Sequence, residues 1–495
     1  MAKKSTRKFK WTVMVYLAGD NNLTEESVFS LTEMEKVRAD DEIAVVAQFD
    51  PRASHIPSHR VVIRGAAHKA ARGTSVRGSL GSDAIPIEDP KITFPQERSG
   101  AKNRTRNRDD DGETDTANRA TLFDFISWTK EHYEAKHYMV ILAGHGAGTE
   151  ENFLLRDDSS RNSLSIPALR DVFENVKNLL KINIDILGMD VCLMSMVEIC
   201  YELNGLVDYL VASESYSPAA GWPYGQILAT LQDRKEESTE DIASNMVKEY
   251  IGFYSDYVMG GLSVDQSVLK VSAIEPVADT VEELADTIDG WLTDRVFSDA
   301  IILAHWEAQS YNGETFVDLQ DFCELLQKRY PKAEEACGKV ILAIRALVRK
   351  SCFTGIENQF SNGVSIYFPW SEVAPSYFRL KFAKDAGWND FLYKYVEATR
   401  RKARGFDVHA KPLLNFGPDT PREPALVSPE SERFRKVEDR KVEDRGAIPI
   451  HSMRNPPIDL YEEGLSGCIR ANPAFVERLK VFSKIRSPKK RKKPR

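Results

Sequence analysis

Apolar runs of strand length recur along the first half of the chain, and each gives way to glycine or to polar residues. The main runs cover residues 11–17, 42–50, 138–143, 184–187 and 209–212. Apolar runs of about 4–8 residues are typical of strands buried on both faces of a parallel sheet. Segments with apolar residues at helical spacing lie between them, and the resulting strand–helix–strand order predicts an α/β fold.

The predicted helices cover residues 24–37, 121–135 and 166–180. We expect Thr24 to be the N-cap of the first one, because acidic residues follow it in the first turn. The segment CLMSMVEICYEL also has apolar residues at helical spacing, so we expect a helix to begin at Cys192.

The remainder of the chain changes character twice. Residues 235–350 are largely helical in pattern, whereas the sequence from residue 401 is charged and proline-rich, repeats KVEDR and ends in RSPKKRKKPR. We therefore expect an α/β domain with a loop excursion, a helical subdomain packed on it, and a charged tail of low order. These parts cover residues 10–230 (excursion 51–118), 231–400 and 401–495, respectively.

A histidine and a cysteine follow two of the buried runs. His145 ends the strand pattern of HYMVILAGH, and Cys192 ends that of NIDILGMDVC. Open α/β sheets collect their chemistry at the carboxyl ends of parallel strands. A thiol beside an imidazole at that edge is the arrangement of a cysteine hydrolase, although a free cysteine can equally be a small buried apolar residue.

The composition is that of a soluble globular protein and gives no sign of a nucleic-acid-binding or membrane-spanning one. The 495 residues are 42% hydrophobic and 28% charged, which is ordinary for a soluble globular chain of more than one domain. The net charge of −7 gives no sign of a nucleic-acid partner, and no apolar run approaches the roughly 18 residues of a membrane span. Six sparse cysteines and the lack of a cleavage site after the basic N-terminus predict a cytoplasmic protein.

The sequence predicts no required cofactor and no metal site. His55 and His59 are four residues apart but lie in a proline-containing loop, so a metal role is not expected there. A calcium-loop spacing is matched in part, with Asn118 where the bidentate glutamate belongs. Calcium therefore stays open, and the matching positions are Asn107, Asp109, Asp111, Gly112 and Asp115.

Seven motifs occur in a characteristic order: VMVYLAGDNNL, ILAGHGAG, MDVCLMSMVE, VASESYSPAAGWPY, FVDLQDFC, GVSIYFP and GWNDFL. Over about residues 10–395 the chain thus resembles the clostripain-like cysteine peptidases of family C11, relatives of caspases, gingipains and legumain. The resemblance implies a caspase-like α/β/α sandwich with a mostly parallel central sheet. It also implies a His/Cys dyad.

The resemblance assigns roles to four residues. Cys192 would be the nucleophile, and His145 would protonate the departing amine. The backbone N–H groups of Gly146 and Cys192 would form the oxyanion hole. Asp190 would lie at the base of the S1 pocket and select Arg or Lys at P1; its alternative role is to cap a helix at Cys192.

The sequence departs from the family pattern at one position. Relatives commonly carry an acidic residue between the Trp and Tyr of the GWxY motif, where this chain has Pro223. Glu214 and Asp208 are near in sequence and could compensate. If that acid contributes to the S1 pocket of relatives, the pocket of this chain has one negative charge fewer.

Family members often activate themselves by cleavage between the two catalytic strands. Arg161 is the first candidate site, since it lies in a polar stretch, and Arg156 is the second. The implied function is that of an endopeptidase acting on proteins or peptides with exposed Arg or Lys. A catalytically idle scaffold or partner-binding module, and a hydrolase or transferase of small amides, are the alternatives; the sequence does not indicate an oligomeric state.

Overall fold

The computed structural model describes residues 8–38, 40–52, 58–63, 84–86, 114–149, 153–257, 261–313 and 315–405. The KVEDR repeat, the basic C-terminus, His55 and residues 107–113 of the candidate calcium loop lie outside this part of the chain. Among the helices described, none combines the length and the apolar character needed to cross a membrane.

A sheet of nine strands forms the centre of the described part, in the order β13-β10-β9-β8-β5-β1-β2-β3-β4. The five middle strands, β9 to β2 in this order, pair in parallel, and the outer strands pair antiparallel. The bounds are β1 Phe9–Gly19, β2 Ile43–Pro51, β3 His59–Val62, β4 Ala84–Pro86, β5 Ala135–Ala143, β8 Ile184–Asp190, β9 Val207–Ala212, β10 Val264–Lys270 and β13 Val348–Thr354. The predicted mostly parallel sheet is confirmed in its middle strands.

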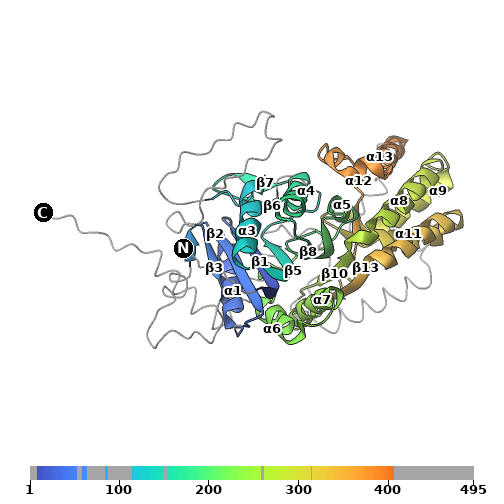
Figure 1. The fold of residues 1–495 in the computed structure, drawn as a ribbon. Coiled ribbons are helices and arrows are strands. Elements are labelled where there is room, and N and C mark those ends of the chain that lie inside the picture. The colour runs from blue at the N-terminus through green and yellow to red at the C-terminus, as the bar shows by residue number, and fades with distance from the viewer. Residues whose placement is uncertain are drawn as a thin grey trace.

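Helices cover both faces of this sheet (Figure 1). One face packs against α1, α6 and α7, and the other against α3, α4, α5 and α8, which gives two separate hydrophobic cores. The bounds are α1 Thr24–Lys36, α3 Arg119–His132, α4 Ile166–Asn175, α5 Val197–Glu202, α6 Tyr224–Arg234, α7 Thr239–Ser255 and α8 Ile274–Asp289. The structure therefore confirms the α/β/α sandwich.

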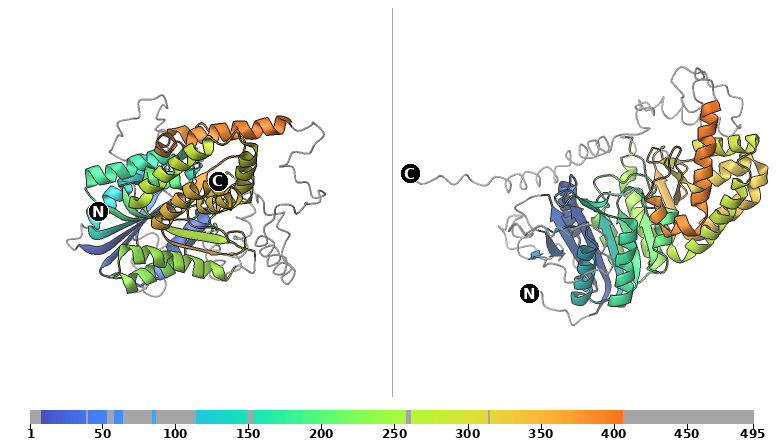
Figure 2. Two further views of the ribbon diagram at one scale, coloured as in Figure 1. Left: turned by 90° about the vertical axis from the view of Figure 1, so that its right-hand side faces the viewer. Right: turned by 90° about the horizontal axis from the view of Figure 1, so that it is seen from above.

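The later part of the chain gathers beyond the β13 edge, as the yellow to orange elements of Figure 2 show. It contains α9 Arg295–Glu307, α10 Leu319–Arg329, α11 Glu334–Leu347, α12 Lys381–Asp385 and α13 Trp388–Gly405. A small antiparallel sheet lies among them, formed by β11 Ser310–Tyr311, β12 Phe316–Asp318 and β14 Ser365–Tyr367. A hairpin of β6 Leu154–Asp157 and β7 Asn162–Leu164 follows the loop that carries His145.

The pattern after residue 230 is less purely helical than predicted, because β10 and β13 belong to the central sheet. The strand β10 has the sequence VDQSVLK, and its polar residues Asp265, Gln266 and Ser267 are nevertheless buried. Buried Asp265 accepts hydrogen bonds from the backbone N–H groups of Glu214 and Ser215, at 2.8 and 3.0 Å. A buried polar strand of this kind has no apolar run by which to identify it.

Two helix starts differ from those expected. Cys192 lies in a turn, and the helix α5 begins only at Val197. Leu193 has φ +63°, a left-handed conformation that a helix does not tolerate. Thr24 is the first residue of α1 rather than its cap, since its hydroxyl donates to the carbonyl of Gly19 instead of accepting from the helix.

Candidate active site

The carboxyl ends of β5 and β8 place His145 and Cys192 at one edge of the sheet. These strands are neighbours, with Ala143 opposite Asp190. The N–H of Gly144 donates to the carbonyl of Asp190 at 3.3 Å, which holds the two loops together. His145, Asp190 and Cys192 line one pocket, so the structure brings together the three side chains that the sequence predicted.

Cys192 is partly exposed, and a neighbouring loop contacts its sulfur. The backbone N–H of Ser217 donates to Sγ at 3.3 Å, and Sγ lies 3.7 Å from the carbonyl oxygen of the same residue. The Ser217 loop is fixed in turn by Ser215, whose carbonyl accepts from the N–H of Leu193 at 3.1 Å. The sulfur thus accepts one hydrogen bond from Ser217 and donates one to the same residue, and these two contacts position the Cys192 side chain.

His145 is oriented by a residue of the loop between β1 and α1. Its Nε2 lies 2.7 Å from Oδ1 of Asn22. Because a carbonyl oxygen can only accept, this contact places the hydrogen on Nε2 and leaves Nδ1 as the proton acceptor. Burial, and secondarily the charge of Arg156, lowers the pKa of His145 to about 4, so the imidazole is neutral at pH 7.

Gly146 allows the two catalytic loops to approach each other. A Cβ at this position would lie 2.7 Å from the carbonyl oxygen of Cys192 and 3.0 Å from Cβ of Val191. Any side chain there would push the loops apart. Close packing of the two loops is therefore one reason for a glycine at position 146. The approach of a substrate is the other.

Asp190 is the last residue of β8 and is only 6% exposed. Its Oδ2 accepts hydrogen bonds from the N–H of Trp222 at 3.1 Å and the hydroxyl of Tyr224 at 2.8 Å. Burial raises the pKa of Asp190 to about 6, although these hydrogen bonds oppose the shift. No helix begins at Cys192, so the alternative role of Asp190 as its cap is wrong.

A second carboxylate lines the pocket, and it comes from an unexpected element. Glu26, in the first turn of α1, lines the pocket together with Asp190, His145 and Cys192. Glu214 and Asp208, the possible substitutes for the acid missing at Pro223, do not line this pocket. Buried Glu214 accepts from the N–H of Gly363 at 2.7 Å, and Asp208 bonds Asn183 at 2.6 Å.

The two candidate cleavage arginines lie on the hairpin that follows His145. Arg161 is exposed at its turn and has φ +53°. Arg156 is in β6, where its Nε donates to Asp158 at 2.9 Å and its carbonyl accepts from Nδ2 of Asn21 at 2.8 Å. Arg161 is therefore the less constrained of the two.

Sequence reasoning missed Asn22, Glu26 and Ser217. Asn22 and Glu26 lie within the first matched motif and just after it, but nothing in their spacing relates them to His145 or to Asp190. Ser217 contributes a backbone group, which has no sequence signature. Asn118, the last position of the candidate calcium loop, accepts from the N–H of Ala120 and caps α3.

The chain resembles known proteins over most of its length. The Clostripain family (peptidase C11) model matches residues 15–396. Clostripain of Hathewaya histolytica is 26% identical over 248 residues, which cover 47% of this chain and 44% of clostripain, so the match spans less than half of that relative.

Two solved structures share the fold. A secreted C11 cysteine protease from Bacteroides thetaiotaomicron, solved with an irreversible peptide inhibitor, has a TM-score of 0.55 at 18% identity; the match covers 77% of this chain and 99% of that one. An inactive zymogen C11 protease from Parabacteroides distasonis has a TM-score of 0.52 at 19% identity with the same coverage. The family match extends over most of the chain and includes both candidate catalytic residues, so this protein belongs to the clostripain family of cysteine peptidases.

Proposed function

We propose that this protein is a cysteine endopeptidase that cleaves after Arg or Lys, with Cys192 as nucleophile and His145 as its acid–base partner. The observation that carries the proposal is a single pocket lined by a thiol, an imidazole and a buried carboxylate. These are the groups required for covalent acyl transfer and for recognition of a cationic side chain. Proteins and peptides with accessible Arg or Lys are the proposed substrates.

The first chemical step follows from the protonation of the two side chains. Nδ1 of neutral His145 takes the proton of Cys192 as Sγ attacks the scissile carbonyl. The imidazolium then gives this proton to the departing amine, which leaves a thioester on Sγ. Water, deprotonated by His145, hydrolyses the thioester and restores the thiol.

The developing oxyanion requires nearby N–H donors. We assign this role to the backbone N–H groups of Gly146 and Cys192, which lie on the two loops held in contact at Gly146. Loss of one such donor typically slows catalysis by about 10²–10³. Their geometry depends on the close packing of these loops.

The P1 preference is supported by two acidic side chains in the pocket. Asp190 is buried, and a buried carboxylate gains most from a ligand that brings the opposite charge. Glu26 adds a second, partly exposed acidic group from α1. We infer that Glu26 supplies the charge that Pro223 does not.

A panel of fluorogenic peptides tests the proposal. Peptides that differ only at P1 (Arg, Lys, Asp, Asn or Leu) are incubated with the wild type and with Cys192→Ala, with and without calcium. We expect the wild type to cleave the Arg and Lys peptides and the variant to be at least about 10³-fold slower. Cys352→Ala is the matched control, since Cys352 is also partly exposed but lies far along the chain on β13.

Two outcomes would contradict the proposal. Cleavage after Asp or Leu alone would remove the role of Asp190. Failure to cleave any peptide, with Cys192 also unreactive toward an alkylating reagent, would favour the idle scaffold instead. The cytoplasmic location stays a prediction.

A further inference from the structure

Three carboxyl groups are buried behind the loop that contacts the sulfur of Cys192. Glu214 begins this loop after β9, Asp265 lies in β10 and Asp318 ends β12. Glu214 and Asp318 are 0% exposed and Asp265 is 1% exposed, and the charges of both aspartates act on Glu214. Carboxylates withdrawn from water in this way repel one another unless a cation or a proton offsets their charge.

The hydrogen bonds of the cluster place a proton on Glu214. Asp318 accepts three bonds, from the N–H of Asp321 at 2.7 Å and from the N–H and Nδ2 of Asn362 at 2.5 and 3.1 Å, as an ionised carboxylate does. Oε2 of Glu214 accepts from the N–H of Gly363 at 2.7 Å, whereas its buried Oε1 accepts from no N–H or O–H of the described residues. The Glu214 and Asp318 side chains nevertheless hydrogen-bond each other, which requires a proton on one of them.

The electrostatics of the surroundings agree with this position of the proton. Burial, together with the charges of Asp318 and Asp265, raises the pKa of Glu214 well above its ordinary value. Burial raises the pKa of Asp318 to about 6 and that of Asp321, in the first turn of α10, to about 7. Tyr311 in β11 faces the same three carboxyl groups, and burial and their charges raise its pKa, so its hydroxyl stays neutral.

The loop that begins with Glu214 reaches the nucleophile through two backbone contacts. The carbonyl of Ser215 accepts from the N–H of Leu193 at 3.1 Å, and the N–H of Ser217 donates to Sγ of Cys192 at 3.3 Å. The first contact fixes the turn that carries Cys192, and the second contacts its sulfur directly. The conformation of loop 214–217 therefore determines where the sulfur lies.

We propose that protonated Glu214 and ionised Asp318 form a positioning pair that holds loop 214–217 against Cys192. Three sequence motifs meet in this pair, since VASESYSPAAGWPY contains Glu214, FVDLQDFC contains Asp318 and GVSIYFP begins with Gly363. The pair touches no reacting atom and acts through the backbone of the loop. Its effect on catalysis rests on the proposed function, whereas the proton on Glu214 does not.

Infrared difference spectroscopy tests the proton directly. The full-length Cys192→Ala chain, which cannot process itself, is compared at pH 7 with the same chain carrying Glu214→Gln. We expect a carboxylic-acid C=O band that is present in the parent, missing from Glu214→Gln and kept in the control Asp208→Asn. A band that Glu214→Gln keeps would overturn the proposal.

Two substitutions of similar size test the positioning. Glu214→Gln keeps a donor for Asp318 and an acceptor for Gly363, whereas Glu214→Met keeps neither. With an Arg peptide, Glu214→Met should lower kcat at least about tenfold and change KM less than about threefold, because Asp190 is untouched. Glu214→Gln should restore kcat to within about threefold of the wild type. Equal kcat values in the two variants would contradict the positioning role.

Alkylation of Cys192 separates this proposal from the proposed function. Its rate with iodoacetamide at pH 7, mapped by mass spectrometry, should differ at least about threefold between Glu214→Met and the wild type, and not for Glu214→Gln. Labelling of Cys352 should be the same in all three proteins. If the wild type cleaves no peptide, the proposed function fails, yet equal alkylation of Cys192 in all three would still be needed to overturn this pair. Circular dichroism checks folding, and Glu214→Leu replaces Glu214→Met if the latter is unfolded.

Discussion

At the scale of single residues, Asp190 links the sheet to substrate selection. It is the last residue of a buried strand, so its carboxyl group is withdrawn from water and its pKa is raised to about 6. His145 has a pKa lowered to about 4 and is neutral from pH 5 to 8. Over this range Asp190 therefore changes its charge, whereas His145 stays neutral.

Preference for a basic P1 residue should depend on pH. The raised pKa means that Asp190 is ionised above about pH 6 and neutral below it. The ratio of kcat/KM for Arg to that for Gln at P1 should therefore fall as the pH is lowered from 8 to 5. In Asp190→Asn the ratio should be at least about a hundredfold lower at pH 8 and independent of pH.

Variants of Glu26 and Asp208 complete this measurement, the first as a smaller effect and the second as a control. Glu26→Gln should lower the ratio about fivefold, because a partly exposed ion pair contributes roughly 1 kcal/mol. Asp208→Asn should leave it unchanged, since Asp208 bonds Asn183 away from the pocket. A ratio that rises toward low pH would contradict the assignment of Asp190.

At the scale of elements, the β6–β7 hairpin connects the catalytic histidine to the candidate cleavage sites. The N–H of Leu155 in β6 donates to the carbonyl of His145 at 2.9 Å. Cleavage at the exposed turn would leave this bond intact, whereas cleavage after Arg156 would cut the strand that makes it. The geometry thus favours a cut at the turn.

Self-cleavage should occur after Arg161. Wild-type protein should separate into two fragments on a denaturing gel, with Asn162 as the new N-terminus. Arg161→Gln and Cys192→Ala should stay as single bands, because one lacks the P1 residue and the other the nucleophile. Fragment masses and N-terminal sequencing identify the bond.

Arg156→Gln is the control for this experiment. It should still be cut at residue 161, although the loss of its charge raises the pKa of His145. A new N-terminus at Asp157, or full-length wild-type protein after long incubation, would show that the assigned site is wrong.

The sequence pattern predicts some secondary-structure elements better than others. Strands such as β1 and β5 could be identified because parallel strands covered on both faces need continuous apolar residues. The prediction of a helix beginning at Cys192 was wrong because tertiary contacts determine the backbone conformation there. Leu193 adopts its left-handed conformation while its N–H bonds the carbonyl of Ser215. Local spacing does not contain that contact.

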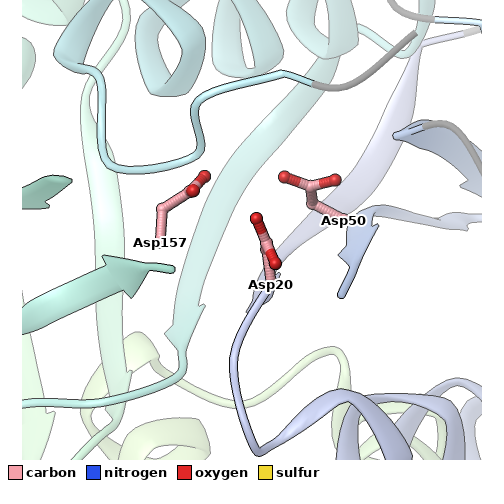
Figure 3. A group of neighbouring side chains, drawn as sticks. All are labelled: Asp20, Asp50 and Asp157. Carbon is pink, nitrogen blue, oxygen red and sulfur yellow. The ribbon is translucent and has the colours of Figure 1, made fainter. Parts of the chain in front are cut away.

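At the scale of the whole molecule, the site is assembled from segments far apart in sequence. His145 and Cys192 were predictable, since both follow strands whose carboxyl ends meet at one edge, and the role of Asp190, the last residue of β8, was implied by the family resemblance. Asn22 and Glu26 reach the same edge only because β1 is central in the sheet. Three buried aspartates, Asp20, Asp50 and Asp157, are brought together in the same way, from the ends of β1, β2 and β6 (Figure 3).

Covalent labelling is the most direct test of the central claim, that Cys192 is the nucleophile of a pocket selective for basic residues. Wild-type protein is treated with a peptidyl chloromethyl ketone carrying Arg at P1, and the modified residue is mapped by mass spectrometry. We predict one adduct per chain, on Cys192, forming at least about tenfold faster than with Asp at P1. Labelling of Cys352 in place of Cys192, or equal rates with Arg and Asp, would contradict the account.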